Sequence, residues 1–238
     1  MSERAPSAAI FGCSGLKLTA DELSFFRRHN PYGFILFSRN IKDPVQVKTL
    51  VDQLRQTTQS SDPPILIDQE GGKVQRLGPP HWQTFSAARC FGEIFSTHPK
   101  EALEACWLNY RLIAEMLFNL GITINCTPVL DVLCADTHQI IGERAYSFDV
   151  NTINELGYAA CKGLLAGSIL PVIKHIPGHG RAQVDSHEEL PTVMSTLDEL
   201  TERDFQPFKA LSSMPLAMTA HIVYTEIDKI FPATMRSL

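Results

Sequence analysis

The chain has 238 residues, of which 44% are apolar and 20% are charged, and its formal net charge is −5. This length allows one large domain or two small ones, and the composition is ordinary for a globular protein with an apolar core. The acidic balance argues against a nucleic-acid partner, because binding to phosphates needs a basic face. No run of 18 apolar residues is present, so we expect no membrane-spanning segment. The first apolar stretch is too short for a signal peptide, and we therefore expect a cytoplasmic protein.

Six short apolar runs alternate with helical patterns along the chain. Each run has the length of a strand and is apolar almost throughout, which is typical of strands covered on both faces. The predicted strands lie in the segments 8–12, 33–37, 64–70, 122–132, 169–177 and 216–224.

Capping signals mark the first two predicted helices. Thr19 and Glu22 are spaced as a capping box, in which the side chain of each residue accepts a hydrogen bond from the backbone N–H of the other. Asp43 and Pro44 begin the second helix, because Pro is favoured in the first turn. The apolar face expected for this second helix consists of Val47, Leu50, Val51 and Leu54.

A longer helix is predicted from about 99 to 120, ending at Gly121. Its apolar residues recur at helical spacing and are Leu103, Trp107, Tyr110, Ile113, Leu117 and Leu120. Another helix is predicted from about 151 to 166. The last one begins at a capping box at 196–199, and we expect Pro207 to kink or divide it.

The alternation of strands and helices predicts a parallel sheet with helices on its faces. Two architectures fit, an open doubly wound sheet and a (β/α)8 barrel, and the barrel needs eight strands where the chain supplies about six. The first strand is not followed by a Gly-x-Gly-x-x-Gly turn, which weakens the dinucleotide-binding form of the open sheet. No linker divides the pattern, so residues 1–238 are predicted to form a single domain.

Polar residues stand at the ends of four predicted strands: Asp68, Asp131, the pair Lys174 and His175, and the segment containing His221. In a parallel α/β fold the carboxyl ends of the strands meet at one face, where sites are built. The sequence therefore predicts that these groups converge.

Each of these polar residues also has a structural interpretation. Asp68 could be a cap or an ion-pair partner, and Arg76 and Arg144 could be ordinary surface charges. His221 could be a neutral, hydrogen-bonded imidazole in the core. Lys174 is harder to explain in this way, because a charge inside an apolar strand is unfavourable unless it is paired or used.

The stretch KHIPGHGRAQVDSHEEL at 174–190 combines three histidines with glycines and an acidic residue. It has three interpretations. His175, His179, Asp185 and His187 could be metal ligands, although a glycine-rich loop gives them no fixed spacing. The loop could be purely structural. Alternatively, Asp185 could fix the tautomer of His187 and raise its pKa, which would make a proton-transfer pair.

Six segments together resemble bacterial β-N-acetylglucosaminidases of glycoside hydrolase family 3. They are DQEGGKVQRL, TPVLDV, IGERAYSFD, KHIPGHG, VDSHEELP and MTAHIVY, and with the run at 33–37 they follow the family order up to residue 224. The resemblance implies a TIM-type (β/α)8 barrel, of which this chain holds about six β/α units as an incomplete N-terminal-type domain. It also implies a cytoplasmic retaining exo-glycosidase that needs no cofactor or metal. Its substrate would be a small carbohydrate that carries a terminal β-linked N-acetylglucosamine. The resemblance points above all to the anhydro-muropeptides of peptidoglycan recycling.

The resemblance also implies roles for individual residues. His187 matches the acid/base of the family, a histidine that replaces the second carboxylate of most glycosidases. Asp185 matches the carboxylate that partners this histidine. The sugar-binding positions of the family match Asp68, Arg76, Arg144, Lys174 and His175. The departures from the family pattern are Lys73 for Arg, Glu143 for Asp, and Arg181 and Ala182 for Asp and Thr.

The nucleophile of the family is an Asp beyond the segment MTAHIVY, and no such segment follows here before Leu238. We therefore expect a C-terminally truncated chain with little or no turnover. Asp131 and Asp149 could be considered as substitutes for the missing nucleophile, but the motifs around them do not mark a nucleophile. Two alternatives stay open. The chain could be a non-catalytic sugar-binding remnant, or a metal-dependent hydrolase on the same barrel that uses His175, His179 and His187.

Overall fold

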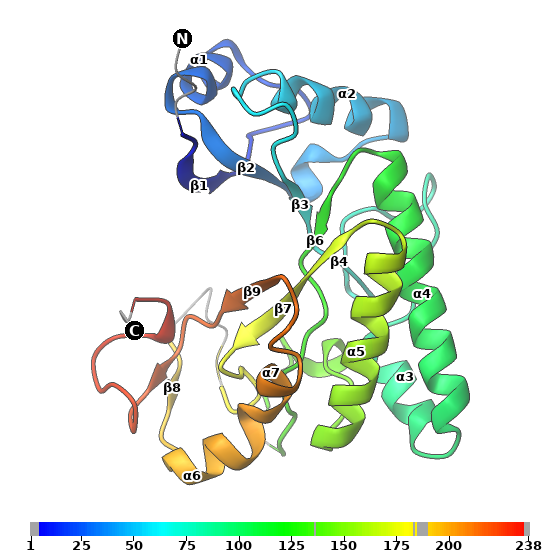
Figure 1. Ribbon diagram of the computed structural model, residues 1–238, viewed down its shortest axis with the longest axis vertical. Helices are drawn as coiled ribbons and strands as arrows, with labels where there is room; N and C mark the ends of the chain where they lie inside the picture. The colour runs from blue at the N-terminus through cyan, green and yellow to red at the C-terminus, as the bar shows by residue number, and fades with distance from the viewer. Residues whose placement is uncertain (1–4, 136, 183, 185–189, 236–238) are drawn as a thin grey trace.

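The computed structural model of the protein describes residues 5–135, 137–182, 184 and 190–235 (Figure 1). Six strands form one sheet in the order β1-β2-β3-β6-β7-β9, and every neighbouring pair is parallel. The strands are β1 (Ser7–Phe11), β2 (Pro31–Leu36), β3 (Ile65–Ile67), β6 (Ile124–Asn125), β7 (Leu170–Ile176) and β9 (Leu216–Thr219). The predicted parallel sheet is confirmed.

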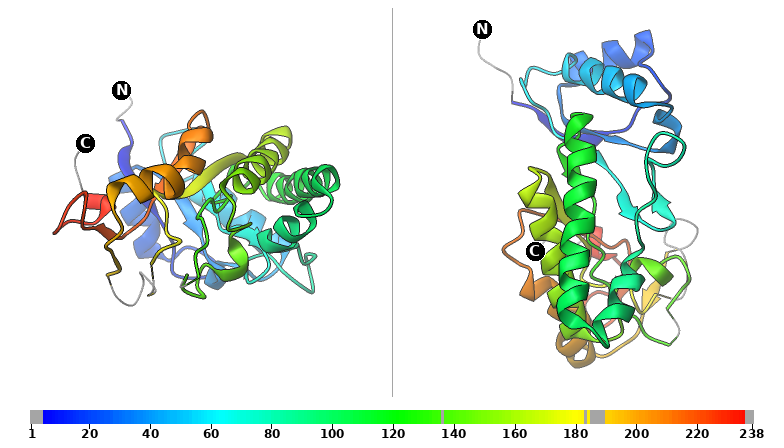
Figure 2. Two further views of the ribbon diagram at one scale, coloured as in Figure 1. Left: turned by 90° about the horizontal axis from the view of Figure 1, so that it is seen from below. Right: turned by 90° about the vertical axis from the view of Figure 1, so that its right-hand side faces the viewer.

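The strand order distinguishes the two architectures that the sequence left open. A doubly wound sheet reverses its order at a switch point, whereas the strands of a TIM-type barrel follow one another around the sheet. Here the order follows the chain without reversal. The sheet curls and the longer helices lie on its outer side (Figures 1 and 2). The six strands, with α-helices after the first five of them in the described chain, have TIM-type architecture, as predicted.

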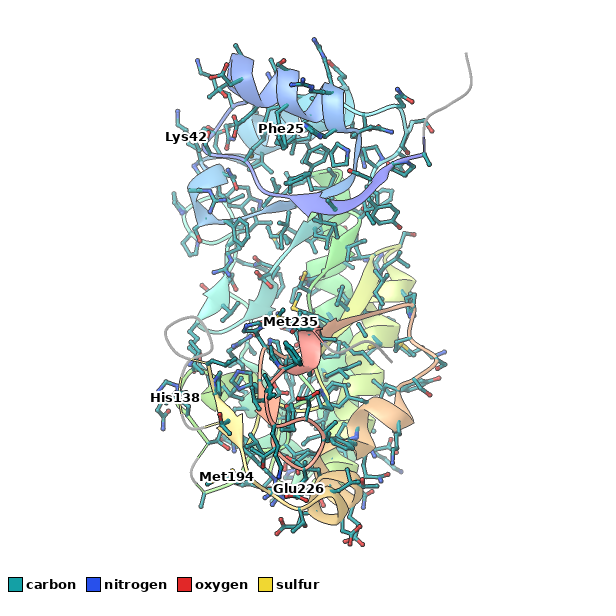
Figure 3. The ribbon with its side chains drawn as sticks, turned by 90° about the vertical axis from the view of Figure 1, so that its left-hand side faces the viewer. Phe25, Lys42, His138, Met194, Glu226 and Met235 are labelled. Atoms are coloured by element: carbon teal, nitrogen blue, oxygen red, sulfur yellow. The ribbon has the colours of Figure 1, made fainter. Side chains whose placement is uncertain are left out.

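The first two helices form where the caps predicted them. The Thr19–Glu22 capping box is present at the start of α1 (Ala20–His29). The side chain of Asp43 accepts a hydrogen bond from Gln46 at the start of α2 (Pro44–Arg55), and all four residues of the predicted apolar face are buried. Phe25 of α1, labelled in Figure 3, packs edge-on against Phe11 of β1 with ring centroids 5.4 Å apart.

The long helix α4 (Pro99–Asn119) packs along α5 (Val150–Ala166) through smaller residues than the sequence predicted (Figure 1). Trp107, expected on the buried face, is 39% exposed, whereas Cys106 is fully buried. The two backbones approach so closely that a Cβ on Gly163 would lie 2.4 Å from the carbonyl oxygen of Trp107. Because large side chains do not fit between such close backbones, the helical phase predicted at Trp107 was wrong.

Several shorter elements differ from the predicted ones. The run at 122–132 is a strand only at β6, where the side chain of Asn125 bonds to the backbone of Gln69. Beyond β6 the chain stays bonded to β7, because Lys174 donates its backbone N–H to Pro128 and accepts that of Leu130. The run at 216–224 is divided into β9 and β10. The helix predicted after 196 is divided before Pro207, as expected. Helix α3 lies between the third predicted strand and the long helix, where no helix was predicted. The remaining elements are β4 (Gln69–Gly71), β5 (Val74–Gln75), β8 (Thr192–Val193), β10 (Val223–Tyr224), α3 (Ala88–Phe95), α6 (Leu197–Glu199), α7 (Gln206–Ala210), η1 (Ser38–Asn40), η2 (Gly142–Arg144), η3 (Leu200–Asp204) and η4 (Ala233–Met235).

The core lies between the outer face of the sheet and the helices. Phe34, Leu36, Ile65 and Ile67 of the strands are fully buried there. A second, smaller apolar cluster lines the inner face of the sheet and consists of Leu66, Ile124, Cys126 and Val172. Among the described helices, none is long and apolar enough to cross a membrane.

Candidate active site

A cavity of about 450 Å³ opens at the carboxyl ends of the sheet strands. Its polar wall comes from Asp68 after β3, from Lys174 and His175 in β7, and from His221 after β9. Active sites of TIM-type barrels are built at this face, and the volume is ordinary for a small-ligand pocket. The convergence predicted from the strand ends is present, and His221 is an exposed pocket residue rather than a core imidazole.

All five residues that the family resemblance assigned to sugar binding line this cavity. They are Asp68, Arg76, Arg144, Lys174 and His175. Lys174 and His175 are consecutive in β7, where side chains ordinarily alternate between the two faces. The register of β7 with β9 shifts between Lys174 and Ile176, and both side chains reach the cavity at this irregularity.

Lys174 is buried and paired with two carboxylates. Its Nζ lies 3.1 Å from Asp68 Oδ1 and 2.6 Å from Glu70 Oε1. Burial alone would lower the pKa of the ammonium, but the charges of Glu70 and Asp68 outweigh it and raise this pKa above its ordinary value. Lys174 is therefore a charged donor at the floor of the pocket.

Asp68 is shared between two cations. Its second oxygen, Oδ2, lies 3.1 Å from Arg76 Nη2. Burial alone would raise the pKa of Asp68, but Lys174 and then Arg76 lower it below its ordinary value. The group is therefore an anionic acceptor, and of the two structural alternatives for Asp68 the ion pair is present.

Glu70 is a site residue that the sequence analysis missed. It forms a two-pronged pair with Arg144, at 2.8 Å from Nε and 2.9 Å from Nη2. Burial would raise the pKa of Glu70, but Lys174 and Arg144 lower it overall. Strand alternation places positions 68 and 70 on the same side, and this signal could have revealed Glu70.

Asp131 lies beneath the pocket and is completely buried. Its Oδ2 is 2.7 Å from Nδ1 of His175, and its Oδ1 accepts from the backbone N–H groups of His175 and His179, at 3.2 and 2.7 Å. Burial would raise the pKa of Asp131, but the two imidazoles and these hydrogen bonds lower it to about 2. Both oxygens are thus engaged, and Asp131 is not placed to attack a ligand.

Asp149, the other carboxylate weighed as an attacking group, has a structural role. Its Oδ2 accepts hydrogen bonds of 2.8 Å from both the backbone N–H and the hydroxyl of Thr152. It is the N-cap of α5 and does not border the cavity. Among the described carboxylates that line the cavity, Asp68 and Glu70 are both ion-paired.

His179 also lines the cavity, with its ring centroid 5.7 Å from that of His175. Burial is the main cause that lowers the pKa of His179, and Asp131 opposes it only in part. Within residues 5–135, 137–182, 184 and 190–235, no group of three or more His, Cys, Asp or Glu side chains lies close enough together to hold a metal ion. His187, the third ligand of the metal alternative, lies outside the described residues.

The expected acid/base pair, Asp185 and His187, lies outside the described residues. Arg181, one of the departures from the family pattern, connects the chain on both sides of 185–189. Its Nε donates to Asp204 Oδ2 at 2.8 Å, and its Nη1 donates to Ser195 at 3.0 Å. Arg181 therefore fixes the described chain before and after the proposed catalytic segment.

Three hydrogen bonds hold the segment 178–182 beside the pocket. The hydroxyl of Tyr224 donates to the carbonyl of Gly178 at 2.6 Å, and that of Thr137 donates to the carbonyl of Gly180 at 2.6 Å. His138, labelled in Figure 3, donates its backbone N–H to Ala182 at 3.2 Å. These bonds fix the segment 178–182 to β10 and to the loop between β6 and η2.

Two other departures from the family pattern, Lys73 and Glu143, are in contact with each other. The backbone N–H of Lys73 donates to Glu143 Oε1 at 2.8 Å. This bond joins the hairpin β4–β5, which carries Arg76 at its end, to η2, which carries Arg144. The two charge-conserving departures therefore support the same wall of the cavity.

The sequence matches a known family along nearly its whole length. Residues 13–238 match the family described as "Glycosyl hydrolase family 3 N terminal domain". The chain belongs to glycoside hydrolase family 3. This membership confirms the resemblance, the enzyme family and the TIM-type fold predicted from the motifs.

One named relative is similar to most of this chain. A protein named beta-hexosaminidase from Methylobacillus flagellatus is 36% identical over 218 residues, which cover 90% of this chain and 61% of that protein. The chain thus spans about three fifths of the length of this relative.

Two solved structures superpose on the fold. NagZ from Neisseria gonorrhoeae, in complex with N-trifluoroacetyl-D-glucosamine, is 33% identical with a TM-score of 0.88, covering 97% of this chain and 67% of that one. A β-N-acetylglucosaminidase of glycoside hydrolase family 3 from Paenibacillus sp. is 30% identical with a TM-score of 0.86, covering 94% of this chain and 43% of that one.

Proposed function

We propose that this chain carries the sugar site of a retaining exo-glycosidase that releases terminal β-linked N-acetylglucosamine. The observation that supports it most is the convergence of Asp68, Arg76, Arg144, Lys174 and His175 in one cavity at the carboxyl ends of the strands. Similarity to a NagZ that holds N-trifluoroacetyl-D-glucosamine supports the same class of ligand. In this proposal residues 1–238 act as one barrel domain.

The charge pattern of the pocket suits a neutral sugar. Each of the cations Arg76, Arg144 and Lys174 is paired with Asp68 or Glu70, so the wall offers directed hydrogen bonds with little net charge. The carboxylate of Asp68 accepts from sugar hydroxyls, whereas the cations donate to hydroxyls and to the acetamido carbonyl.

The proposed chemistry uses two steps. In the first, a carboxylate attacks the anomeric carbon and the bond from this carbon to the glycosidic oxygen breaks, which gives a glycosyl–enzyme ester. His187, oriented by Asp185, gives its proton to the glycosidic oxygen, so that the aglycone leaves as an alcohol. In the second step, neutral His187 takes a proton from water, which attacks the same carbon and releases the sugar. The family resemblance assigns the attacking Asp to a segment that follows MTAHIVY. The natural substrate would be a cell-wall muropeptide handled in the cytoplasm during peptidoglycan recycling.

Sugar binding is tested by calorimetric titration of the 238-residue chain with N-acetylglucosamine. We expect Arg76→Gln to weaken binding about 10- to 100-fold, because it removes a charged hydrogen bond in the pocket. Arg111→Gln is the matched control, since Arg111 pairs with Glu115 on the surface of α4. Equal affinities of the unaltered chain and both variants would contradict the proposed site.

The acid/base role of His187 is tested on a preparation that turns over an aryl β-N-acetylglucosaminide. His187→Ala should lower kcat roughly 10²- to 10⁴-fold on a substrate with a poor leaving group, and less on one with an activated leaving group. A change below about threefold on the poor leaving group would remove His187 from this role. Sugar binding without turnover would favour the non-catalytic sugar-binding alternative.

A further inference from the structure

Asp131 serves two different partners with its two oxygens. Oδ1 accepts the backbone N–H groups of His175 and His179, which closes the turn between β7 and the glycine-rich segment. Oδ2 is 2.7 Å from the ring nitrogen Nδ1 of His175. A carboxylate that only held the turn would need just the two backbone hydrogen bonds to Oδ1. The ring contact therefore requires its own explanation.

The ring contact fixes which nitrogen of His175 carries the proton. An ionised carboxylate can only accept, so Nδ1 must donate to Oδ2. In the neutral ring, the other nitrogen, Nε2, then has a free lone pair. Because the His175 side chain lines the cavity, Nε2 is the ring nitrogen left to meet a ligand there.

We propose that Asp131 is a positioning residue that fixes the tautomer of His175, so that Nε2 accepts a hydrogen bond from a hydroxyl of the bound sugar. The identity of the ligand rests on the proposed function, whereas the tautomer does not depend on any ligand. Asp68 offers a second acceptor to the same cavity, and the cations beside it donate. His175 thus adds an acceptor that bears no charge.

The substitution Asp131→Asn separates the two roles of the carboxylate. An amide has one accepting oxygen and one donating NH₂ group. Two backbone N–H groups point at the Oδ1 position, so the amide oxygen should remain there and the NH₂ should face Nδ1 of His175. Nδ1 would then have to accept, and the ring proton would move to Nε2. The same change in a catalytic triad leaves the geometry intact and produces the wrong tautomer.

The experiment records long-range ¹H–¹⁵N spectra of the full chain with labelled histidine, at about pH 8.5, which is above the ordinary imidazole pKa of about 6.5. His175→Gln assigns the ring signals. We expect a protonated Nδ1 and an unprotonated Nε2 in the unaltered chain, and the reverse in Asp131→Asn. Asp149→Asn, at the N-cap of α5, should leave the His175 signals unchanged.

Two results would overturn the role of Asp131 in the tautomer. One is an unaltered chain whose neutral His175 carries its proton on Nε2, a measurement that needs no variant to fold. The other is a folded Asp131→Asn variant in which Nδ1 keeps the proton.

A sugar titration tests the second half of the proposal. We expect Asp131→Asn to weaken N-acetylglucosamine binding at least 10-fold, and Asp149→Asn to change it by less than threefold. An inverted tautomer with unchanged affinity would overturn the role of Nε2 in sugar binding. If the unaltered chain bound no sugar, the proposed function would fail, while the ring signals would still decide the role of Asp131.

Discussion

At the scale of single residues, Lys174 is the centre of the charge network of the pocket. Its ammonium is 2% exposed and lies between Asp68 and Glu70, which belong to segments more than a hundred positions away. Buried charges of this kind are stable only as a set, because each one loses its hydration and regains interaction energy from its partners alone. Together with Arg76 and Arg144, which pair with the same two carboxylates, these five charges behave as one structural unit.

Lys174→Met should destabilise the protein by about 3 kcal/mol, because it removes the cation between two buried carboxylates while Arg76 and Arg144 compensate only in part. The measurement is urea unfolding at pH 7. Arg111→Met is the control, and it should change the free energy of unfolding by less than about 1 kcal/mol, since its pair with Glu115 is exposed. Similar losses in the two variants would show that the buried network adds no stability of its own.

Asp131 should make stability depend on acidity in a defined range. Its pKa is about 2 in the folded protein and about 3.9 in an unfolded chain, so its contribution is complete above pH 4 and is lost as the pH falls towards 2. The difference in unfolding free energy between the unaltered protein and Asp131→Asn should therefore shrink by roughly 2 kcal/mol between pH 5 and pH 2. A difference that stays constant over urea-unfolding series in this range would contradict the assignment.

Single residues also show the limits of inference from the sequence. Asp68, Lys174 and His175 were found because they end apolar runs, and the parallel fold brings such ends together. Glu70 was not predicted as a site residue, and the sequence did not show that Asp131 pairs with His175. Both depend on contacts between positions 44 or 74 residues apart, and local patterns carry no information on such contacts.

At the scale of elements, caps were the most reliable signals. Thr19 with Glu22 and Asp43 begin their helices as predicted, because a cap is a contact within one turn of chain. The prediction of which residues of α4 are buried was wrong at Trp107, because the close approach of α5 determines which side chains fit between the two helices. A glycine in α5, Gly163, allows this approach.

Gly163→Ala should destabilise the protein by about 1 to 3 kcal/mol, because the added Cβ would meet the backbone of α4. The same change usually stabilises a helix by up to about 1 kcal/mol, so the sign of the effect is the test. Gly15→Ala is the matched control, since no atom lies within 4 Å of the added Cβ. A gain in the thermal midpoint for Gly163→Ala would mean that the two helices are less tightly packed than described.

At the scale of the whole molecule, the fold followed from the sequence more directly than the site did. Strand and helix alternation predicts a parallel sheet, and the motif order predicts a TIM-type barrel, because both depend on patterns repeated along the entire chain. The strand order without reversal then distinguishes the barrel type from the doubly wound sheet. Composition and periodicity alone left both architectures possible.

Ligand binding should stabilise the molecule globally, because the pocket joins β3, β7 and η2. N-acetylglucosamine at about 100 times its Kd adds about 2.7 kcal/mol to the stability of a protein that binds it only when folded. For a chain of this length, we expect the thermal midpoint to rise by about 5 to 10 °C. Arg76→Gln at the same sugar concentration should show a smaller rise, and an equal rise would indicate binding elsewhere.

The ion pairs of the pocket also restrict how pieces of related barrels can be exchanged. Asp68, Glu70 and Arg76 arrive together with β3 and the hairpin β4–β5, but the other two cations arrive with β7 and with η2. A chimera that took only β3 and this hairpin from this protein would import two acids with one of their three bases. Grafting is therefore expected to succeed only when these distant segments are transplanted together.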